Sequence, residues 1–291
     1  MGGAPVVPAD DRRHPPGDDR RWQESWELDL VTADGGLGAT FRLTLHPHDG
    51  VSWVWCSVVG EGRRLVTVVE LEAPLPRAGS LDLRCEGLWI DLVCEAPLEH
   101  WSVGLEAFGV ALDDPIDALR GLRGDRVGVG LDVGWERAGE PWVAPGGCYV
   151  VPATVAGEVL VGDEVLLVDG WGTWIHRWGV VPRRSPSTRA VAGRLDDGTT
   201  FLAAAGAGVV IGPDGVGHEG AALLDDDGLS ASDGLPSTAS VSLGALDLAL
   251  AVEHLAPVPL PARGASALVR ALCSVRATDG RAGTAWWTTT G

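Results

Sequence analysis

The amino-acid sequence predicts an all-β protein made of two tandem antiparallel β-barrels or sandwiches with little helix. Short runs rich in Val, Leu, Thr and Trp alternate with turn signals at hairpin spacing, which is typical of antiparallel sheets. Asp-Gly recurs between these runs, and it suits the positive backbone angles of a tight hairpin turn. The pairs are Asp34-Gly35, Asp49-Gly50, Asp169-Gly170, Asp197-Gly198, Asp214-Gly215, Asp227-Gly228, Asp233-Gly234 and Asp279-Gly280. A length of 291 residues is enough for two such domains.

Residues 1–21 are predicted to be a disordered tail, because prolines and charges leave too little apolar surface for a packed core. A first β domain is expected over residues 22–181. Its candidate strands are residues 25–31, 39–45, 51–58, 64–71, 80–85, 88–94, 101–112, 126–135 and 148–161. One short helix is expected near Pro115, which fits a first helical turn behind the capping residues Asp113 and Asp114.

The stretch from Val180 to Pro186 is typical of a linker, since it contains two prolines and two adjacent arginines. A second β domain is expected over residues 187–291. Its candidate strands are residues 188–195, 199–205, 209–211, 239–254 and 267–288, with a weakly patterned acidic segment before residue 239.

The greatest concentration of chemically useful side chains lies in residues 169–179, just before the linker. If this run is extended, Trp174, His176 and Trp178 point to one face, while Thr173, Ile175 and Arg177 point to the other. An imidazole between two indoles can relay a proton, and indole faces can stabilise a nearby cation. The same pattern also fits a core strand whose histidine hydrogen-bonds a neighbour. The glycines of this run indicate a close approach by backbone or ligand.

The net charge of −18 argues against a nucleic-acid partner, because such binding depends on neutralising phosphates with Lys and Arg. A basic membrane-binding patch is excluded on the same ground. The chain contains no Lys, which rules out a lysine Schiff base. No leader and no apolar run of about 18 residues is found, so no integral membrane segment is expected and the protein is predicted to be cytoplasmic.

The five cysteines form no C-x-x-C pair and are predicted to be free thiols. No dinucleotide fingerprint, phosphate-binding loop or nucleophile elbow is present, so no cofactor is expected. The stretch from His46 to Asp49 lies in a predicted turn without a second cluster of ligands, and no metal is predicted.

Tryptophans on several strands suggest a binding site for an apolar small molecule. If the strands close into a barrel, these rings could line one aromatic cavity, although they could equally fill a solid core. The candidate substrate-binding residues are Trp53, Trp55, Trp89, Trp171 and Trp174.

Asp91 is the candidate acid within an otherwise apolar strand. Facing inward, burial would hold it as a neutral acid at physiological pH. Facing outward, with Ile90 and Leu92 inside, it is a polar residue on the outer side of a strand.

Two stretches resemble the lipocalin-like superfamily of carotenoid 1,2-hydratase (hydroxyneurosporene synthase) and AttH. The first runs from Val155 through Val168-Asp169-Gly170-Trp171-Gly172 to His176-Arg177-Trp178-Gly179, and it is similar to a strand and Gly-x-Gly turn leading into Arg-Asp-His-Ser-Trp-Gly. The second runs from Cys273 to Trp287 and is similar to the closing strand pair.

The resemblance implies two lipocalin-like β-barrels with an apolar pocket, and cofactor-free chemistry on isoprenoids or polyenes. It implies that His176 and Trp178 belong to the active site. The superfamily's Arg-Asp is replaced here by Trp174-Ile175, and its serine by Arg177. The hydratases also have a Tyr and an Asp on a following strand, roughly where this chain has Thr200 to Ala205.

Three functions follow as hypotheses. The first is a cofactor-independent enzyme that starts cyclisation, isomerisation or hydration of a terpenoid or polyene by protonation, with His176, Trp178 and Asp91 as catalytic residues. The second is a pericyclase of the Diels–Alderase kind, in which rate enhancement comes from orientation. The third is a non-catalytic protein that binds a lipophile. The oligomeric state is left open.

Overall fold

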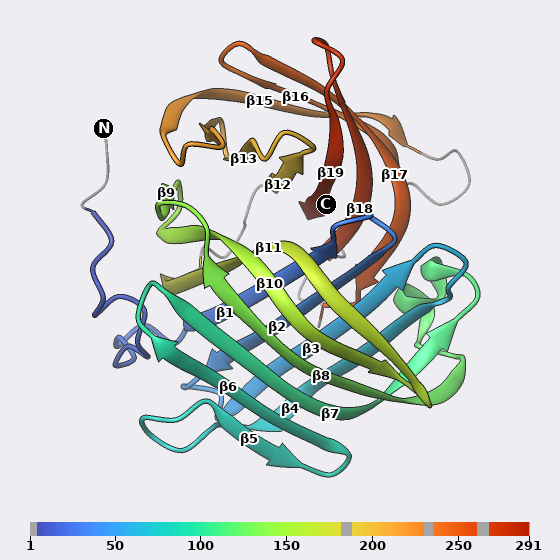
Figure 1. Ribbon diagram of the computed structural model, residues 1–291. Helices are drawn as coiled ribbons and strands as arrows, with labels where there is room; N and C mark the ends of the chain where they lie inside the picture. The colour runs from blue at the N-terminus through green and yellow to red at the C-terminus, as the bar shows by residue number, and fades with distance from the viewer. Residues whose placement is uncertain (1–4, 182–187, 230–234, 261–267, 291) are drawn as a thin grey trace.

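The computed structural model describes residues 5–181, 188–229, 235–260 and 268–290, and these are almost entirely β-strand. Figure 1 shows two curved bodies, one built from the blue-to-yellow part of the chain and one from the orange-to-red part. The prediction of an all-β protein with little helix is therefore confirmed. The predicted linker lies almost wholly in residues 182–187, outside the described part of the chain.

The first body is an antiparallel sheet in the order β4-β3-β2-β1-β11-β10-β8-β7-β6-β5, with β9 beside β10. A further pairing of β4 with β7 returns the sheet on itself, and we call this body the first barrel. Its strands are β1 (Trp22–Thr32), β2 (Leu37–His46), β3 (Val51–Gly60), β4 (Leu65–Pro74), β5 (Asp82–Cys85), β6 (Leu88–Ala96), β7 (His100–Leu112), β8 (Asp125–Arg137), β9 (Trp142–Ala144), β10 (Cys148–Val161) and β11 (Glu164–Val180).

The second body is a closed barrel in which the strands follow chain order from β12 to β19. Its strands are β12 (Thr188–Leu195), β13 (Thr200–Ala204), β14 (Ala207–Ile211), β15 (Gly217–Leu229), β16 (Pro236–Leu243), β17 (Leu246–Val258), β18 (Leu268–Ala277) and β19 (Ala282–Thr290). The single strands predicted over residues 239–254 and 267–288 are each split by a turn. The described part of the acidic segment contains the strand β15.

Most of the described Asp-Gly pairs form turns, but Asp169-Gly170 and Asp227-Gly228 lie inside the strands β11 and β15. The glycines at positions 35, 50, 198, 215 and 280 have φ between 73° and 95°, which fits the predicted turn geometry. Gly170 instead lies inside β11, where a β-carbon would collide with the carbonyl oxygen of Val31 on β1. Gly172 approaches the carbonyl of Asp29 in the same way. These glycines therefore allow close backbone approach between two strands.

The predicted helix is a short 3₁₀ helix, η1 (Pro115–Arg120). Asp114 is its N-cap and accepts a hydrogen bond from the backbone of Ile116.

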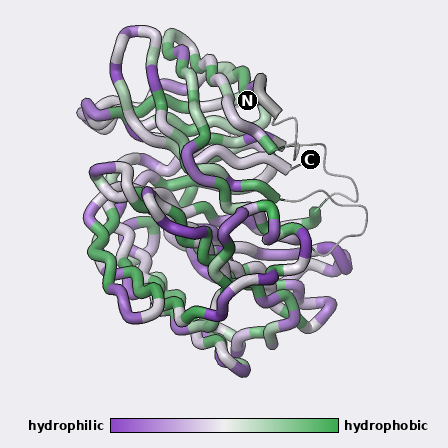
Figure 2. The backbone as a smooth tube through the Cα atoms, turned by 90° about the vertical axis from the view of Figure 1, so that its right-hand side faces the viewer, coloured by the Kyte–Doolittle hydropathy of each residue, from purple (hydrophilic) through white to green (hydrophobic). Residues whose placement is uncertain are grey.

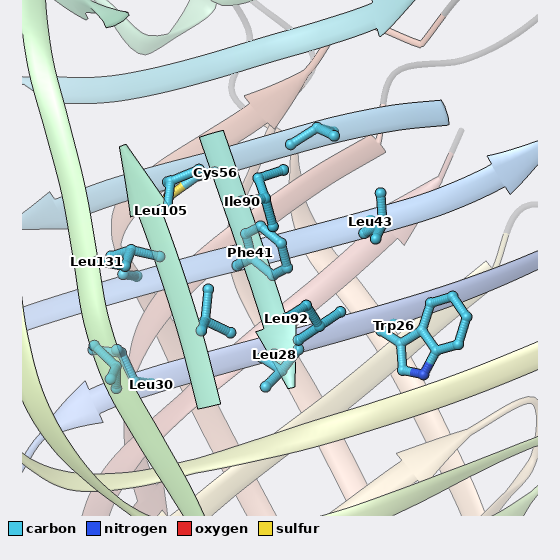
Figure 3. Packing of buried hydrophobic residues seen from close by; sticks show 14 of the residues in the cluster. Trp26, Leu28, Leu30, Phe41, Leu43, Cys56, Ile90, Leu92, Leu105 and Leu131 are labelled. Atoms are coloured by element: carbon cyan, nitrogen blue, oxygen red, sulfur yellow. The ribbon is translucent and has the colours of Figure 1, made fainter. Parts of the chain in front are cut away.

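Separate apolar clusters fill the two barrels, and Figure 2 shows hydrophobic and hydrophilic residues alternating along many strands. Figure 3 shows part of the first cluster, in which Trp26 and Leu28 of β1 lie with Ile90 and Leu92 of β6. All five cysteines are free. Within the described residues, no helix is long and apolar enough to cross a membrane.

A buried group of charged residues joins the two barrels. Arg270 of β18 is 2% exposed; it donates to Glu27 and, at 2.8 Å, to Asp29, both on the outer face of β1. Arg42 of β2 donates to the other oxygen of Glu27 at 2.9 Å. The indole of Trp286 lies 5.2 Å from the Arg270 guanidinium. The barrels are therefore held together by paired charges as well as by apolar contact.

Candidate active site

The inner face of β11 carries the predicted aromatic row. Trp174 belongs to the first-barrel core cluster and Trp178 packs against it, while His176 between them is fully buried. Ile175 packs against a cluster that includes residues of the second barrel, so it faces the other way. The predicted alternation along this strand is confirmed.

His176 has a partner at each ring nitrogen. Its Nε2 lies 3.0 Å from Oε1 of Glu24 on β1, and its Nδ1 lies 3.2 Å from the hydroxyl of Tyr149 on β10. The ring of Trp26 stacks on the imidazole, with centroids 4.6 Å apart and an interplanar angle of 21°. The antiparallel register brings these groups together, because Trp26 and Tyr149 both lie directly opposite His176 on the neighbouring strands.

The described part of the N-terminal segment, residues 5–21, completes this network, contrary to the prediction that this part belongs to a disordered tail over residues 1–21. Asp11 is completely buried. Its carboxylate accepts hydrogen bonds from the backbone N–H of Leu98 at 2.6 Å, from Nε1 of Trp101 at 2.9 Å and from the hydroxyl of Tyr149. Composition suggested disorder because the segment is polar, but its polar groups are satisfied by partners distant in the sequence.

His14 lies at the outer end of the network. Its backbone N–H donates to Glu24 at 2.9 Å, and its Nδ1 lies 2.8 Å from Oε1 of the same residue. Its ring stacks on Trp178 with centroids 4.1 Å apart. The side chain of His14 is 21% exposed, whereas those of Glu24 and His176 are 0% exposed. Solvent therefore reaches this end of the network.

The hydrogen-bond directions require one proton between Glu24 and His176. Tyr149 has a single hydroxyl proton, which it donates to Asp11, so its oxygen accepts from Nδ1–H of His176. A neutral imidazole then has a bare Nε2, which faces the Glu24 carboxyl group. A protonated Glu24 satisfies this contact by donating to Nε2. Burial raises the pKa of Glu24, and burial lowers the pKa of His176 to about 4, so both effects favour this assignment.

The buried histidines make stability depend on pH in a defined direction. Burial lowers the pKa values of His176 and His46 to about 4, whereas imidazoles of the unfolded chain titrate near 6.5. The unfolded chain thus binds more protons between pH 6.5 and 4. We expect the free energy of unfolding to fall over this window, by about 3 kcal/mol for His176. Glu24 acts in the opposite sense, because its raised pKa favours the folded state in acid and this contribution is lost as the pH rises.

Urea unfolding at pH 7.5 and pH 5 measures this change. In a His176→Gln variant, the free energy of unfolding should differ less between the two pH values, since His46 is then the only one of the two histidines with a lowered pKa that remains. An equal difference in variant and wild type would contradict the role of His176.

Asp11 is expected to hold the N-terminal segment in place. In an Asp11→Ala variant, Leu98, Trp101 and Tyr149 each lose a buried acceptor. Leaving buried donors unpaired costs about 1–3 kcal/mol each, so we expect marked destabilisation and release of the segment. Hydrogen exchange at residues 5–21 measures the release. An Asp18→Ala variant on the same segment is the control, and unchanged exchange in Asp11→Ala would disprove the anchoring role.

His14, Glu24 and His176 also have the composition of a metal site, with one ligand atom from each within 4.8 Å of the others. Ligands about 2.1 Å from a tetrahedral zinc ion lie roughly 3.4 Å apart. The contacts of 2.8 and 3.0 Å are shorter than this and have the length of hydrogen bonds. A shared proton explains the cluster without a metal ion.

The structure places Asp91 away from this site. Ile90 and Leu92 lie in the core cluster, whereas Asp91 is half-buried on the opposite face of β6. The outward alternative is therefore the one adopted, because the larger apolar side chains take the inner face. Trp89 shares the outer face, where Arg84 lies 5.7 Å from its ring.

The other predicted tryptophans do not share a cavity with His176. Trp55 is buried in a cluster with Val258 and Leu268 of the second barrel, and Trp53 packs against this cluster. Trp171 lies in another inter-barrel cluster and donates to Thr284 at 3.1 Å. The strands do carry these rings, but on the face that contacts the second barrel.

Two cavities lie between parts of the two barrels. One, of about 260 Å³, is lined by Val59 and Arg63 on one side and His254 on the other. The second, of about 770 Å³, is lined by Trp142 and Glu219 among others. Neither is lined by the aromatic row of β11. The side chains of His176 and Glu24 are not exposed, so their site is closed in this structure.

Sequence reasoning missed Asp11, His14, Glu24, Trp26 and Tyr149. The tyrosine was the easiest to find, because it is the only one in the chain. The resemblance directs attention to a tyrosine and an aspartate after His176, where β13 of the second barrel has neither. Here the tyrosine and two carboxyl groups come from segments before His176.

Comparison with solved structures confirms the predicted resemblance at the level of the fold. The chain is similar to a structure from Nitrosomonas europaea assigned as AttH, with a TM-score of 0.64, 14% identity and coverage of 99% of both chains. It is similar to kievitone hydratase from Nectria haematococca, with a TM-score of 0.63 and 12% identity over 98% of this chain and 92% of that one. It is also similar to CghA, with a TM-score of 0.56 and 10% identity over 93% and 88% of the two chains.

No curated protein matches the chain in sequence. Residues 7–290 match the family described as a domain of unknown function, DUF7064. The match includes both barrels and most of the N-terminal segment that carries Asp11 and His14, and the chain therefore belongs to the DUF7064 family.

Proposed function

We propose that the protein is a cofactor-independent enzyme that protonates a carbon–carbon double bond of a long apolar isoprenoid or polyene and thereby starts hydration, isomerisation or cyclisation. The observation that carries this proposal is the 3.0 Å contact between Oε1 of Glu24 and Nε2 of His176, both fully buried, to which the hydrogen-bond directions assign one proton. A protonated carboxyl group in an apolar site is a stronger acid toward an alkene than water and remains available at neutral pH. The shared fold with a protein named as a hydratase supports the same class of chemistry.

In the first step, Glu24 gives its proton to one alkene carbon. The π electrons form the new C–H bond, the other carbon becomes a cation, and Glu24 becomes a carboxylate. The indole of Trp26, two residues from Glu24 on β1 and stacked on His176, can stabilise the positive charge, and Trp174 lies farther along the barrel interior.

The second step returns the proton. In hydration, water attacks the cation and loses a proton to Glu24, so that the net reaction adds water to the alkene. In isomerisation or cyclisation, the cation loses a neighbouring proton to the same carboxylate. His176 positions Glu24 and is itself positioned by Tyr149 and Asp11.

The substrate is expected to enter at the end covered by His14. This side chain is partly exposed, and its ring covers Trp178. Displacing His14 would open Glu24 and one face of Trp178 without unfolding a strand, because residues 5–21 include no strand of either barrel.

Turnover in D₂O with farnesol, geranylgeraniol and lycopene as probes tests the proposal. Protonation of an alkene must place one non-exchangeable deuterium on carbon in the product, which mass spectrometry detects. Product without carbon-bound deuterium would favour the pericyclase hypothesis, which needs no proton donor. Recovery of every probe unchanged would favour a lipophile carrier. If a chelator removed the activity and zinc restored it, the His14–Glu24–His176 cluster would instead be identified as a metal centre.

A further inference from the structure

The inner face of the first barrel presents two buried hydrogen-bond donors without a partner. Trp26 and Trp174 are each 1% exposed, and among the described residues their Nε1 atoms have no hydrogen-bond acceptor. An indole N–H is a donor only, so each requires an acceptor atom. Buried polar groups are nearly always paired, and an unpaired one points to a missing partner.

Two other buried indoles on the inner face of this barrel are paired, whereas Trp55 and Trp89, on its outer face, are also without a partner in the described part of the chain. Trp101 donates to Asp11 at 2.9 Å, and Trp135 donates to the backbone oxygen of Asp29 at 2.7 Å. The fold therefore provides acceptors for tryptophans elsewhere in the core. Of the two unpaired donors, Trp26 lies two residues from Glu24 on β1, and Trp174 lies farther along the same face, opposite Leu28.

The strand register makes the two donors neighbours. Trp26 lies opposite His176, and Leu28 of the same strand lies opposite Trp174, so the two tryptophans form a diagonal pair across β1 and β11. Diagonal neighbours on one face are about 7–8 Å apart, which is within the reach of indole side chains. Figure 3 shows the Trp26 ring in the buried layer with Leu28 and Leu92. Trp287, an unpaired indole of the second barrel, belongs to a different core cluster and lies away from Glu24 and His176.

We infer that the substrate carries an oxygen acceptor, such as a hydroxyl or carbonyl group, which Trp26 and Trp174 bind farther along β1 and β11 than the double bond that Glu24 protonates. This inference rests on the proposed function for the position of the reacting bond, and it narrows the substrate class to oxygenated isoprenoids or polyenes. A pure hydrocarbon would leave both donors unpaired. An acceptor held there also fixes which double bond lies near Glu24, because the distance from the oxygen to the reacting carbon is set by the two strands.

Binding of two matched probes tests this inference without any turnover. Farnesol has a hydroxyl group, and farnesene has a closely similar carbon skeleton without oxygen. We expect the wild-type protein to bind farnesol about tenfold more tightly in titrations followed by calorimetry. Trp26→Phe and Trp174→Phe keep an apolar ring but remove the N–H group, and each should weaken farnesol binding about fivefold while leaving farnesene binding unchanged.

Trp287→Phe is the matched control, because it removes an equally buried, unpaired indole N–H in the other barrel. It should leave the affinity for both probes unchanged. A wild-type protein that binds farnesol no more tightly than farnesene, including one that binds neither, overturns the inference. An equal loss of affinity for both probes in the Trp26 and Trp174 variants also overturns it.

The two proposals fail separately. If deuterium enters the product but the protein binds farnesol no more tightly than farnesene, only the oxygen-binding role of the two indoles is refuted. If the protein binds farnesol selectively but no deuterium enters the product, only proton transfer from Glu24 is refuted.

Discussion

A Glu24→Gln variant is expected to lose turnover by about 10² to 10⁴-fold, which is the usual contribution of a positioned acid. Glutamine has nearly the same size and can still hydrogen-bond His14 and His176, but it has no acidic proton to give. The initial rate of product formation in D₂O, compared with that of the wild type, measures the effect. Farnesol affinity should change little, because the proposed oxygen contacts come from Trp26 and Trp174.

The control for this variant is Glu106→Gln, which changes an exposed glutamate on the outer face of β7. It should keep wild-type turnover. Retention of activity within about fivefold by Glu24→Gln would remove Glu24 from the proton-transfer step. A His176→Gln variant should lose less than Glu24→Gln, because His176 positions the carboxyl group and does not give the proton to substrate.

Replacing Arg270 with methionine is expected to destabilise the protein by about 3–5 kcal/mol. The substitution leaves Glu27 and Asp29 buried with their shared cation removed, and breaking a buried pair from one side carries this cost. Arg42 still pairs with Glu27 but makes no contact with Asp29 among the described hydrogen bonds. Urea denaturation at pH 7.5 measures the change in the free energy of unfolding.

The matched control is Arg281→Met, in the same barrel. Arg281 pairs with Asp197 and Asp279 at the surface, where such contacts contribute about 0–1 kcal/mol. Adding Glu27→Gln and Asp29→Asn to Arg270→Met should recover part of the lost stability, because the uncompensated charges are then gone. Equal effects of Arg270→Met and Arg281→Met would show that the inter-barrel ion pairs contribute no more to stability than ion pairs at the surface.

Local sequence determined the strands of this protein well. Trp174, His176 and Trp178 alternate with Thr173 and Ile175, and a strand has a two-residue period, so their common face could be derived directly. The Asp-Gly turns outside β11 and β15 follow from backbone sterics, which act within a few residues. The resemblance around His176 also pointed to the correct fold.

Only the tertiary structure decided which side chains meet His176. In the sequence, Glu24 lies 152 residues before His176 and Tyr149 lies 27 residues before it, and strand pairing alone brings both next to the imidazole. Asp11 lies 165 residues before His176. The same applies to the tryptophans, because alternation assigns two faces but not which face is the inside of a barrel and which meets a second domain. Asp11 lies in a segment whose composition indicates disorder, and it is ordered by donors that other parts of the chain supply. Local interactions fix the strands. The site around Glu24 and His176 depends instead on contacts between strands and on a polar N-terminal segment, whose ordered conformation cannot be predicted from its local sequence.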